Sequence, residues 1–229
     1  MHLSAEDLNQ LSEKQISVEE INRQLKVFTN NKGSLTVERP CTLGDGILKL
    51  DTEQRDKFIA KYKQDSPSRK IIKFIPASGA ATRMFKHLYA WDDPSFASLV
   101  NAFKKSFQDL PFLDLLSDCF TAHNLSLKQL IKENNWFKIN ELILESNGLG
   151  YGESPKGLIP FHKYLDHVRT AFEEHLAESK SYVSVGGVTN IHFTVSGHAQ
   201  KAIENFLNAR KYMFENETEF RLSYSVQST

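Results

Sequence analysis

The stretch KFIPASGAATRMFKHLY, residues 73–89, decides the fold expected for this chain. It continues the β-branched run KIIKFI at residues 70–75, which is typical of a short buried strand. Pro76 ends that run, and five small residues follow at positions 77–81. From Thr82 the spacing of apolar residues becomes helical. The stretch therefore predicts a strand, a small-residue loop and a helix.

A second alternation of elements lies near the end of the sequence. IHFTV at residues 191–195 predicts a strand, and Ser196 is placed to cap the helical pattern that follows it. EFRLSYSVQ at residues 219–227 then alternates apolar and polar residues, as strands do. Strand, helix and strand within about 35 residues form a βαβ unit with parallel strands. We therefore expect an open, mostly parallel, Rossmann-like α/β sheet.

Helices are expected on both sides of the first strand. Residues 4–28 read as two amphipathic helices, the first capped by Ser4 and the second by Ser17 with Glu20. Residues 92–147 form a helical insert that ends at Gly148, the expected C-terminal glycine. We interpret its large apolar residues as core rather than as a ligand slot: Phe96, Leu99, Phe103, Phe107, Phe112, Leu115, Leu116 and Phe120.

These patterns predict a helical extension over residues 1–69 and an α/β domain over residues 70–229 that carries the insert. Lysine plus arginine equals aspartate plus glutamate at 28 each, which gives no global charge for binding nucleic acid or an anionic membrane. The sequence has no signal-peptide pattern and no run approaching about 18 apolar residues, so we expect a cytoplasmic protein. Cys41 and Cys119 are too isolated to indicate a zinc site or a disulfide framework.

The small-residue loop has the features of a phosphate site. Ligands of open α/β sheets bind beyond the carboxyl ends of the strands, where small side chains let the backbone approach a phosphate. Arg83, just behind the loop, offers a permanently charged, bidentate clamp. The alternative is a tight turn packed against a neighbouring element. The predicted phosphate-binding residues are Ala77, Ser78, Gly79, Ala80, Ala81 and Thr82.

Two stretches together resemble a known family. Pro76 to Met84 is similar to the signature of the nucleotide-diphospho-sugar transferases, the sugar-1-phosphate nucleotidyltransferases and UDP-sugar pyrophosphorylases, whose small-residue loop ends in Gly-Thr-Arg-Met. Their Pro-Lys motif is matched by PKGLIP at residues 155–160, and residues 163–172 resemble the helix that comes next. The chain also resembles an uncharacterised bacterial domain-of-unknown-function family that shares the PASGAATRM and PKGLIPFH stretches.

The resemblance implies that a nucleoside triphosphate and a sugar 1-phosphate react to give a nucleotide-diphospho-sugar and pyrophosphate. Arg83 would neutralise the triphosphate, Lys156 would hold the sugar phosphate or α-phosphate, and the backbone of residues 78–81 would face the nucleotide. His162, within six residues of Lys156, is a further candidate. His192 and His198 are instead expected to be hydrogen-bonded structural residues, with a ligand contact as the alternative for His198, which stands at a helix N-terminus beyond a strand.

Two departures from the signature open a second interpretation. Ala81 stands where the family has its second glycine, which alters the approach of the backbone to phosphate. The family also holds Mg²⁺ with an acidic residue on a later strand, and the chain offers only Asp45 and Asp166 as candidates. The resemblance therefore implies a domain that is incomplete at its C-terminus. The alternative function is a degenerate, non-catalytic domain that binds nucleotide or mediates assembly.

Overall fold

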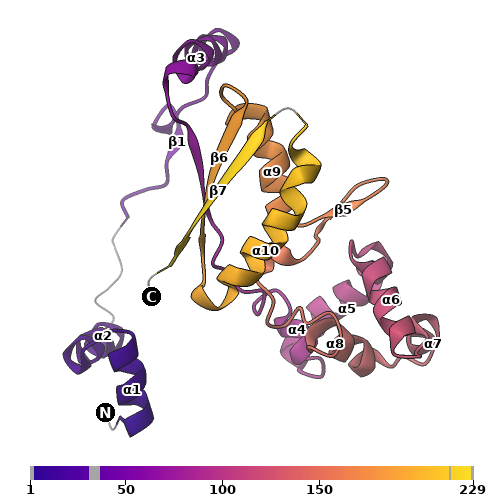
Figure 1. Cartoon of the computed structure of the whole chain (residues 1–229). Helices are drawn as coiled ribbons and strands as arrows, with labels where there is room; N and C mark the ends of the chain where they lie inside the picture. Colours follow the sequence, from indigo (N-terminus) through magenta and orange to yellow (C-terminus); the bar gives the residue numbers. More distant parts are fainter. Residues whose placement is uncertain (1–2, 31–36, 217, 228–229) are drawn as a thin grey trace. The chain divides into compact units, whose positions relative to one another are not determined.

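The computed structural model describes residues 3–30, 37–216 and 218–227 (Figure 1). The chain divides near Lys63 into an N-terminal unit and a C-terminal unit, each described by itself. The N-terminal unit contains helices α1 (Ala5–Glu13) and α2 (Val18–Asn30), a short pair of strands, β1 (Thr42–Leu43) and β2 (Gly46–Ile47), and most of α3 (Thr52–Asp65).

The predicted caps of the first two helices are confirmed. The Ser4 hydroxyl accepts a hydrogen bond from the Asp7 amide at 3.1 Å, and the Ser17 hydroxyl accepts one from the Glu20 amide at the same distance. Each bond satisfies an amide that the first turn of a helix leaves without a partner.

The C-terminal unit is built on a three-stranded parallel sheet. Its strands are β3 (Ile72–Pro76), β6 (Val188–Val195) and β7 (Glu219–Val226), in the order β3-β6-β7. Both pairings are parallel, so the predicted strands and βαβ unit are confirmed. The protein is therefore a mixed α/β fold with a small parallel sheet and many helices.

One face of the sheet is covered by α9 (Ala171–Tyr182) and α10 (Gln200–Arg210), as Figure 1 shows. Alternate residues of β6 are buried on that face and pack against apolar residues of both helices. The opposite face carries His192, whose two ring nitrogens lie 2.9 Å from the hydroxyls of Ser223 and Ser225. His192 is thus a hydrogen-bonded structural residue, as expected.

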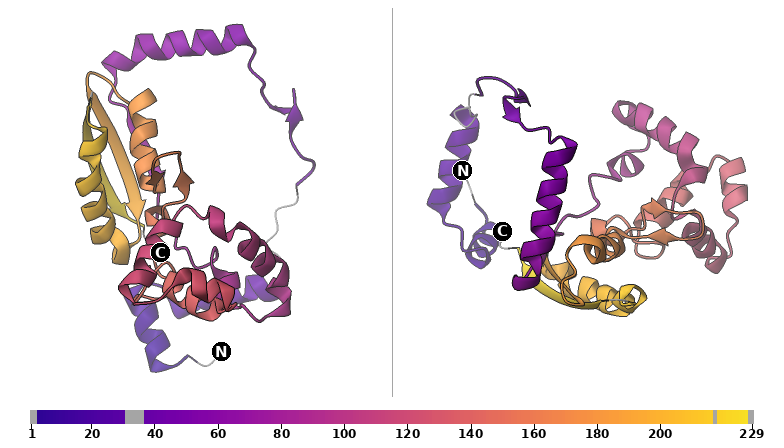
Figure 2. Two further views of the ribbon diagram at one scale, coloured as in Figure 1. Left: turned by 90° about the vertical axis from the view of Figure 1, so that its right-hand side faces the viewer. Right: turned by 90° about the horizontal axis from the view of Figure 1, so that it is seen from above.

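The helices between β3 and residue 145 form a second core. They are α4 (Lys86–Tyr89), α5 (Ala97–Ser106), α6 (Leu113–Ala122), α7 (Leu127–Lys132) and α8 (Trp136–Leu144), with short 3₁₀ turns at Pro94–Phe96 and Phe107–Asp109. Figure 2 shows α5 to α8 gathered in one group. Phe103, Phe107, Phe112 and Phe120 lie in their shared core, whereas Leu99 and Leu115 are exposed.

The chain after the small-residue loop is not the long helix predicted from Thr82. Residues 82–85 form a turn, and α4 is only four residues long. The Met84 amide donates to the Ala81 carbonyl at 2.9 Å, the spacing of a turn, and Ala81 and Phe85 are both buried in the helical core. Arg83 therefore lies in a turn rather than in the first turn of a helix.

Residues 163–172 also differ from the helix that the resemblance implied. They contain an antiparallel hairpin of β4 (His162–Lys163) and β5 (Val168–Arg169), and α9 begins only at Ala171. The hairpin is closed by a hydrogen bond of 2.8 Å from the Tyr164 amide to the His167 carbonyl. The helix starts late because Thr170 and Glu173 form a capping box.

Gly148 has a different role from the one predicted. Helix α8 ends at Leu144, so Gly148 lies beyond the capping position. A Cβ atom on Gly148 would lie 2.1 Å from the carbonyl oxygen of Leu142. Glycine is needed at this position because two segments of backbone approach closely.

Candidate functional site

A cavity of about 400 Å³ lies beyond the carboxyl end of β3. Its wall is mostly apolar, and every titratable side chain that lines it is a lysine or a histidine. The lining residues come from β3, the small-residue loop and the turn after it, the Pro-Lys segment (residues 155–160), the chain from Phe161 into β4, and α9: Ile75, Pro76, Ala77, Gly79, Met84, Lys156, Gly157, Phe161, His162, Ala171, Phe172 and His175.

Main-chain contacts join the two stretches that resemble the transferase signature. The Lys156 amide donates a 3.0 Å hydrogen bond to the Gly79 carbonyl, and the Ala81 amide donates one of 3.3 Å to the Ser154 carbonyl. Ala80 and Pro155 pair as an isolated antiparallel bridge. The fold thus brings together two segments that the helical insert separates in sequence.

The small-residue loop is held at the carboxyl edge of the sheet. The Ala77 amide donates to the Thr194 carbonyl at 2.7 Å. The Ser78 hydroxyl donates to the side-chain carbonyl of Gln227. The backbone amide of Gln227 in turn donates to the Val195 carbonyl at 2.9 Å. Loop and strand ends are therefore connected by both main-chain and side-chain bonds.

The loop residues differ in what surrounds them. Within the described residues, no hydrogen bond engages the amides of Ser78, Gly79 or Ala80. A Cβ on Gly79 would meet no atom within 4 Å, so the glycine is not explained by packing. Ala81, in contrast, is fully buried in the helical core and its amide already has a partner. The first part of the loop is open to a ligand, and Ala81 belongs to the core.

The structure brings together only some of the predicted side chains. Lys156 opens a 3₁₀ turn (Lys156–Leu158), and His162 lies on β4; both are exposed and line the cavity. Thr82 and Arg83 are exposed in the turn that follows the loop and do not line it.

His175 on α9 is a lining residue that the sequence analysis missed. Its Nδ1 is buried, makes no hydrogen bond in the described structure, and lies 3.5 Å from Oε2 of Glu178. Burial, followed by the charge of Lys73, lowers the pKa of His175, while Glu178 acts in the opposite direction. The apolar rings of Phe161 and Phe172 were missed as well. Only the packing of α9 beside β3 shows that these residues share a cavity.

Glycine at position 157 shapes the same wall. A Cβ atom there would lie 2.6 Å from Cε2 of Phe172, whose ring is buried in the core of the sheet layer. Gly157 therefore allows the Pro-Lys segment to pass close to α9 and fixes the width of the cavity.

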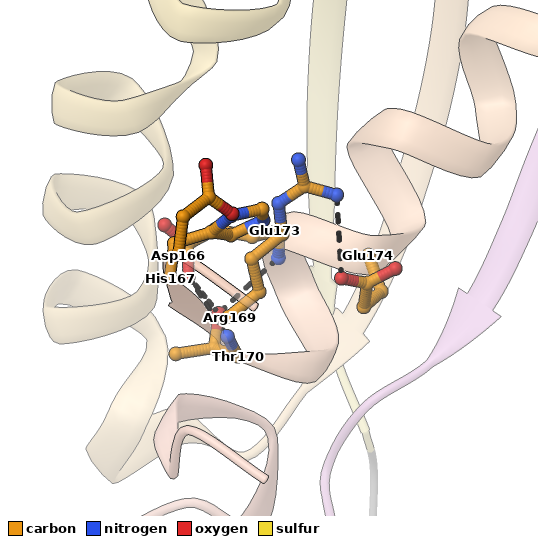
Figure 3. A network of polar contacts seen from close by, with 6 residues as sticks. All are labelled: Asp166, His167, Arg169, Thr170, Glu173 and Glu174. Atoms are coloured by element: carbon orange, nitrogen blue, oxygen red, sulfur yellow. Dashed lines mark hydrogen bonds and ion pairs between the residues drawn. The ribbon is translucent and has the colours of Figure 1, made fainter. Parts of the chain in front are cut away.

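A polar network fixes the start of α9 (Figure 3). Glu173 is buried; its Oε2 accepts from the Thr170 amide at 2.8 Å, and its Oε1 lies 3.4 Å from Arg210. Arg169 reaches Glu174 at 3.5 Å. The side chains of Thr170 and Glu173 thus cap the start of α9.

Among the residues that the structure describes, no aspartate or glutamate lines the cavity where Mg²⁺ would be held. Among the described residues, no group of three or more His, Cys, Asp or Glu side chains could hold a metal ion. Asp45 is paired with Arg39, and the exposed Asp166 binds Nδ1 of His167 at 2.6 Å. Both carboxylates already have partners, and Asp166 does not line the cavity.

The parallel sheet and the basic cavity at its carboxyl edge define a mixed α/β protein with a candidate ligand site. A family model described as "Domain of unknown function (DUF4301)" matches residues 4–229, so the chain belongs to this family. Comparisons with curated proteins and with solved structures gave no match. In the described ranges, no helix has the length and apolar character needed to cross a membrane.

The ion pair behind the cavity predicts an acid-sensitive contribution to stability. Hydrogen bonds from Lys73 and then from Tyr182 lower the pKa of Glu178 from 4.5 to about 2. Since the folded-state pKa is depressed, the contribution is present above pH 4.5 and is lost as the pH falls towards about 2. Glu178→Gln should therefore flatten the pH dependence of the unfolding free energy in this window, measured by urea denaturation.

Glu145→Gln is the matched control for this measurement. Glu145 is exposed in the same unit and forms no ion pair within the described residues. Its substitution should leave the pH profile unchanged. Parallel profiles for Glu178→Gln and the parent protein would show that the ion pair contributes nothing, as surface pairs often do.

Proposed function

We propose that this chain is a nucleotidyltransferase-like protein whose cavity binds a nucleoside triphosphate and a sugar 1-phosphate. The observation that carries the proposal is the hydrogen bond between the Lys156 amide and the Gly79 carbonyl. It joins the two halves of the transferase-like signature at one cavity. The parallel order β3-β6-β7 supports a Rossmann-like assignment for the sheet.

The cavity has the chemistry that such a ligand requires. The amides of residues 78–80 have no hydrogen-bond partner among the described residues, and Lys156 and the two histidines of the cavity each have an N–H that can donate to phosphate. The rings of Phe161 and Phe172 supply an apolar wall suited to a nucleobase. Its volume, about 400 Å³, is within the usual range of ligand pockets.

The proposed reaction is an in-line displacement at phosphorus. An oxygen of the sugar phosphate bonds to the α-phosphorus, the bond from that phosphorus to the bridging oxygen breaks, and pyrophosphate leaves with the electron pair. Such a step depends on positioning and on cancelling charge rather than on a protein nucleophile. Lys156 and the loop amides would provide both.

A second candidate is a non-catalytic domain that binds the nucleotide without turnover. The observation that favours it is the lack of an acidic metal site among the described residues. The two candidates share the binding site and differ only in the release of pyrophosphate.

The test is calorimetric titration with UTP and GTP, followed by an assay of pyrophosphate release with a panel of sugar 1-phosphates. Binding with release is expected. Binding without release would support the non-catalytic candidate, and no binding of either nucleotide would contradict both.

Arg83→Ala tests the role of the exposed turn. A hydrogen-bonded contact with a charged group contributes about 1.5–3 kcal/mol, so loss of Arg83 should weaken UTP binding at least about tenfold. Thermal unfolding should not change, because Arg83 is exposed. Arg69→Ala removes the same charge ahead of β3 and should keep the affinity. Equal UTP affinity in both variants would remove Arg83 from the site.

A further inference from the structure

We propose that His175 binds the phosphate of the ligand as an imidazolium that takes up a proton on binding, and that Glu178 and Lys73 hold its ring in place. The inference deepens the proposed function and rests on it for one point, that the ligand carries phosphate. It adds a proton-linked contact on α9 to the amides and Lys156.

The position of the ring defines which nitrogen is available. His175 lines the cavity, and its Nδ1 is buried at 3.5 Å from Oε2 of Glu178. Nε2 is therefore the ring nitrogen left for a ligand. In the imidazolium, Nδ1–H is directed to a carboxylate and Nε2–H is free for a phosphate oxygen.

Glu178 is itself held from two elements. Lys73 of β3 is only 13% exposed and lies 2.5 Å from Oε2 of Glu178. The Tyr182 hydroxyl donates to the other oxygen, Oε1, at 2.8 Å. The carboxylate beside His175 is thus fixed by the edge strand of the sheet and by the next turn of α9. Glu178 and Lys73 act as positioning residues.

The charges around the ring favour an anion in the cavity. His175 faces Lys73 on β3, Glu178 on α9 and His162 on β4, and Lys156 lines the same cavity. One carboxylate is therefore set against several basic groups. A phosphate dianion at Nε2 would balance this excess and would favour the charged ring.

In the free protein, the surroundings of His175 favour the uncharged ring instead. Desolvation and Lys73 keep the pKa of His175 below its ordinary value of 6.5, so near neutral pH the ring is uncharged. An anion raises that pKa, and binding is then coupled to proton uptake. The affinity is highest at pH values below the pKa of His175 in the free protein. The affinity falls about tenfold per pH unit as the pH rises from there towards the pKa of His175 in the complex.

The test is calorimetry of the full chain with inorganic phosphate and with UTP, each in two buffers of different ionisation enthalpy. The difference in heat gives the protons taken up, and comparison with His175→Gln cancels the contribution of the ligand's own titration. We expect His175→Gln to lose about one proton of uptake between the pKa of His175 in the free protein and its pKa in the complex, and to bind about tenfold more weakly near pH 6. His198→Gln is the matched control, because His198 is exposed and does not line the cavity.

Two further measurements separate the role of His175 from a loss of folding. The ring nitrogen shifts of His175 in the parent protein, followed by NMR, should move to the imidazolium position when phosphate is added. Glu178→Gln should shift the pH profile of affinity to lower pH, because the carboxylate that favours the charged ring is gone. A purely structural role of Glu178 would not move that profile.

The outcomes distinguish this inference from the proposed function. If UTP binds but proton uptake is the same in His175→Gln, the inference is wrong and the nucleotide site remains. If phosphate binds with proton uptake that His175→Gln loses, while UTP does not bind, the inference holds and the proposed function fails. If neither probe binds between about pH 5.5 and about pH 8.5, both are overturned.

Discussion

Gly148→Ala is expected to destabilise the C-terminal unit by about 3 kcal/mol or more, the size of a severe overpacking change. The added Cβ would lie 2.1 Å from the carbonyl oxygen of Leu142 and 2.6 Å from its carbonyl carbon. Backbone cannot move aside as a flexible side chain can, and α8, which contains Leu142, lies within the helical core. The whole turn after α8 must therefore shift.

The measurement is urea or thermal unfolding of the purified variant. Gly79→Ala is the matched control, because the same added methyl group meets no atom within 4 Å. That variant should be neutral or stabilised by about 0.4–1 kcal/mol through a less flexible unfolded chain. Equal stability of the two variants would show that the turn after α8 is not packed as described.

Lys156→Ala is expected to weaken sugar 1-phosphate binding at least about tenfold, the effect of removing one charged contact with phosphate. The fold should persist, because Lys156 is exposed and the bond that ties it to Gly79 uses its amide. We further expect a smaller loss of UTP affinity, since in the proposed function the amides of residues 78–80 also contact the nucleotide.

Calorimetry with each ligand, alongside thermal unfolding, checks this result. Lys163→Ala removes an exposed lysine of β4 that does not line the cavity, and its ligand affinities should match the parent protein. A Lys156→Ala variant that unfolds more easily but binds both ligands normally would make Lys156 a structural residue.

The sheet could be predicted because its strands have distinct patterns. The apolar run at residues 70–75 and the alternation in residues 219–227 each identify a strand without help from the rest of the chain. The parallel arrangement followed from the helix between the last two strands. These features depend on local spacing, and the structure confirms them.

The hairpin at residues 162–169 and the start of α9 were not predicted, although one signal was present. Thr170 and Glu173 have the spacing of a capping box, which places the helix start at Ala171. The resemblance of residues 163–172 to a helix points the other way. Two-residue strands give too short a pattern to be identified from sequence alone.

The approach of the two main-chain segments at the candidate site could be predicted from the sequence, but the residues that surround them could not. The order of the two signature stretches suggested that Lys156 returns to the small-residue loop, and main-chain bonds now join them. His175 could not be found, because its place in the cavity depends on how α9 packs beside β3. Nor did the spacing show that Ala81 faces the core, since buried and ligand-facing small residues look alike in a sequence.

The hydrogen bond between residues 79 and 156 has a consequence for how this family diversifies. It uses only main-chain atoms, so the path of both segments does not depend on which side chain position 156 carries. A member of the family could exchange lysine for another residue there and keep the same pocket with a different preference for ligand charge. Under the proposed function, position 156 is accordingly where selection, or a designer, can change ligand preference without changing the main-chain path of the two segments.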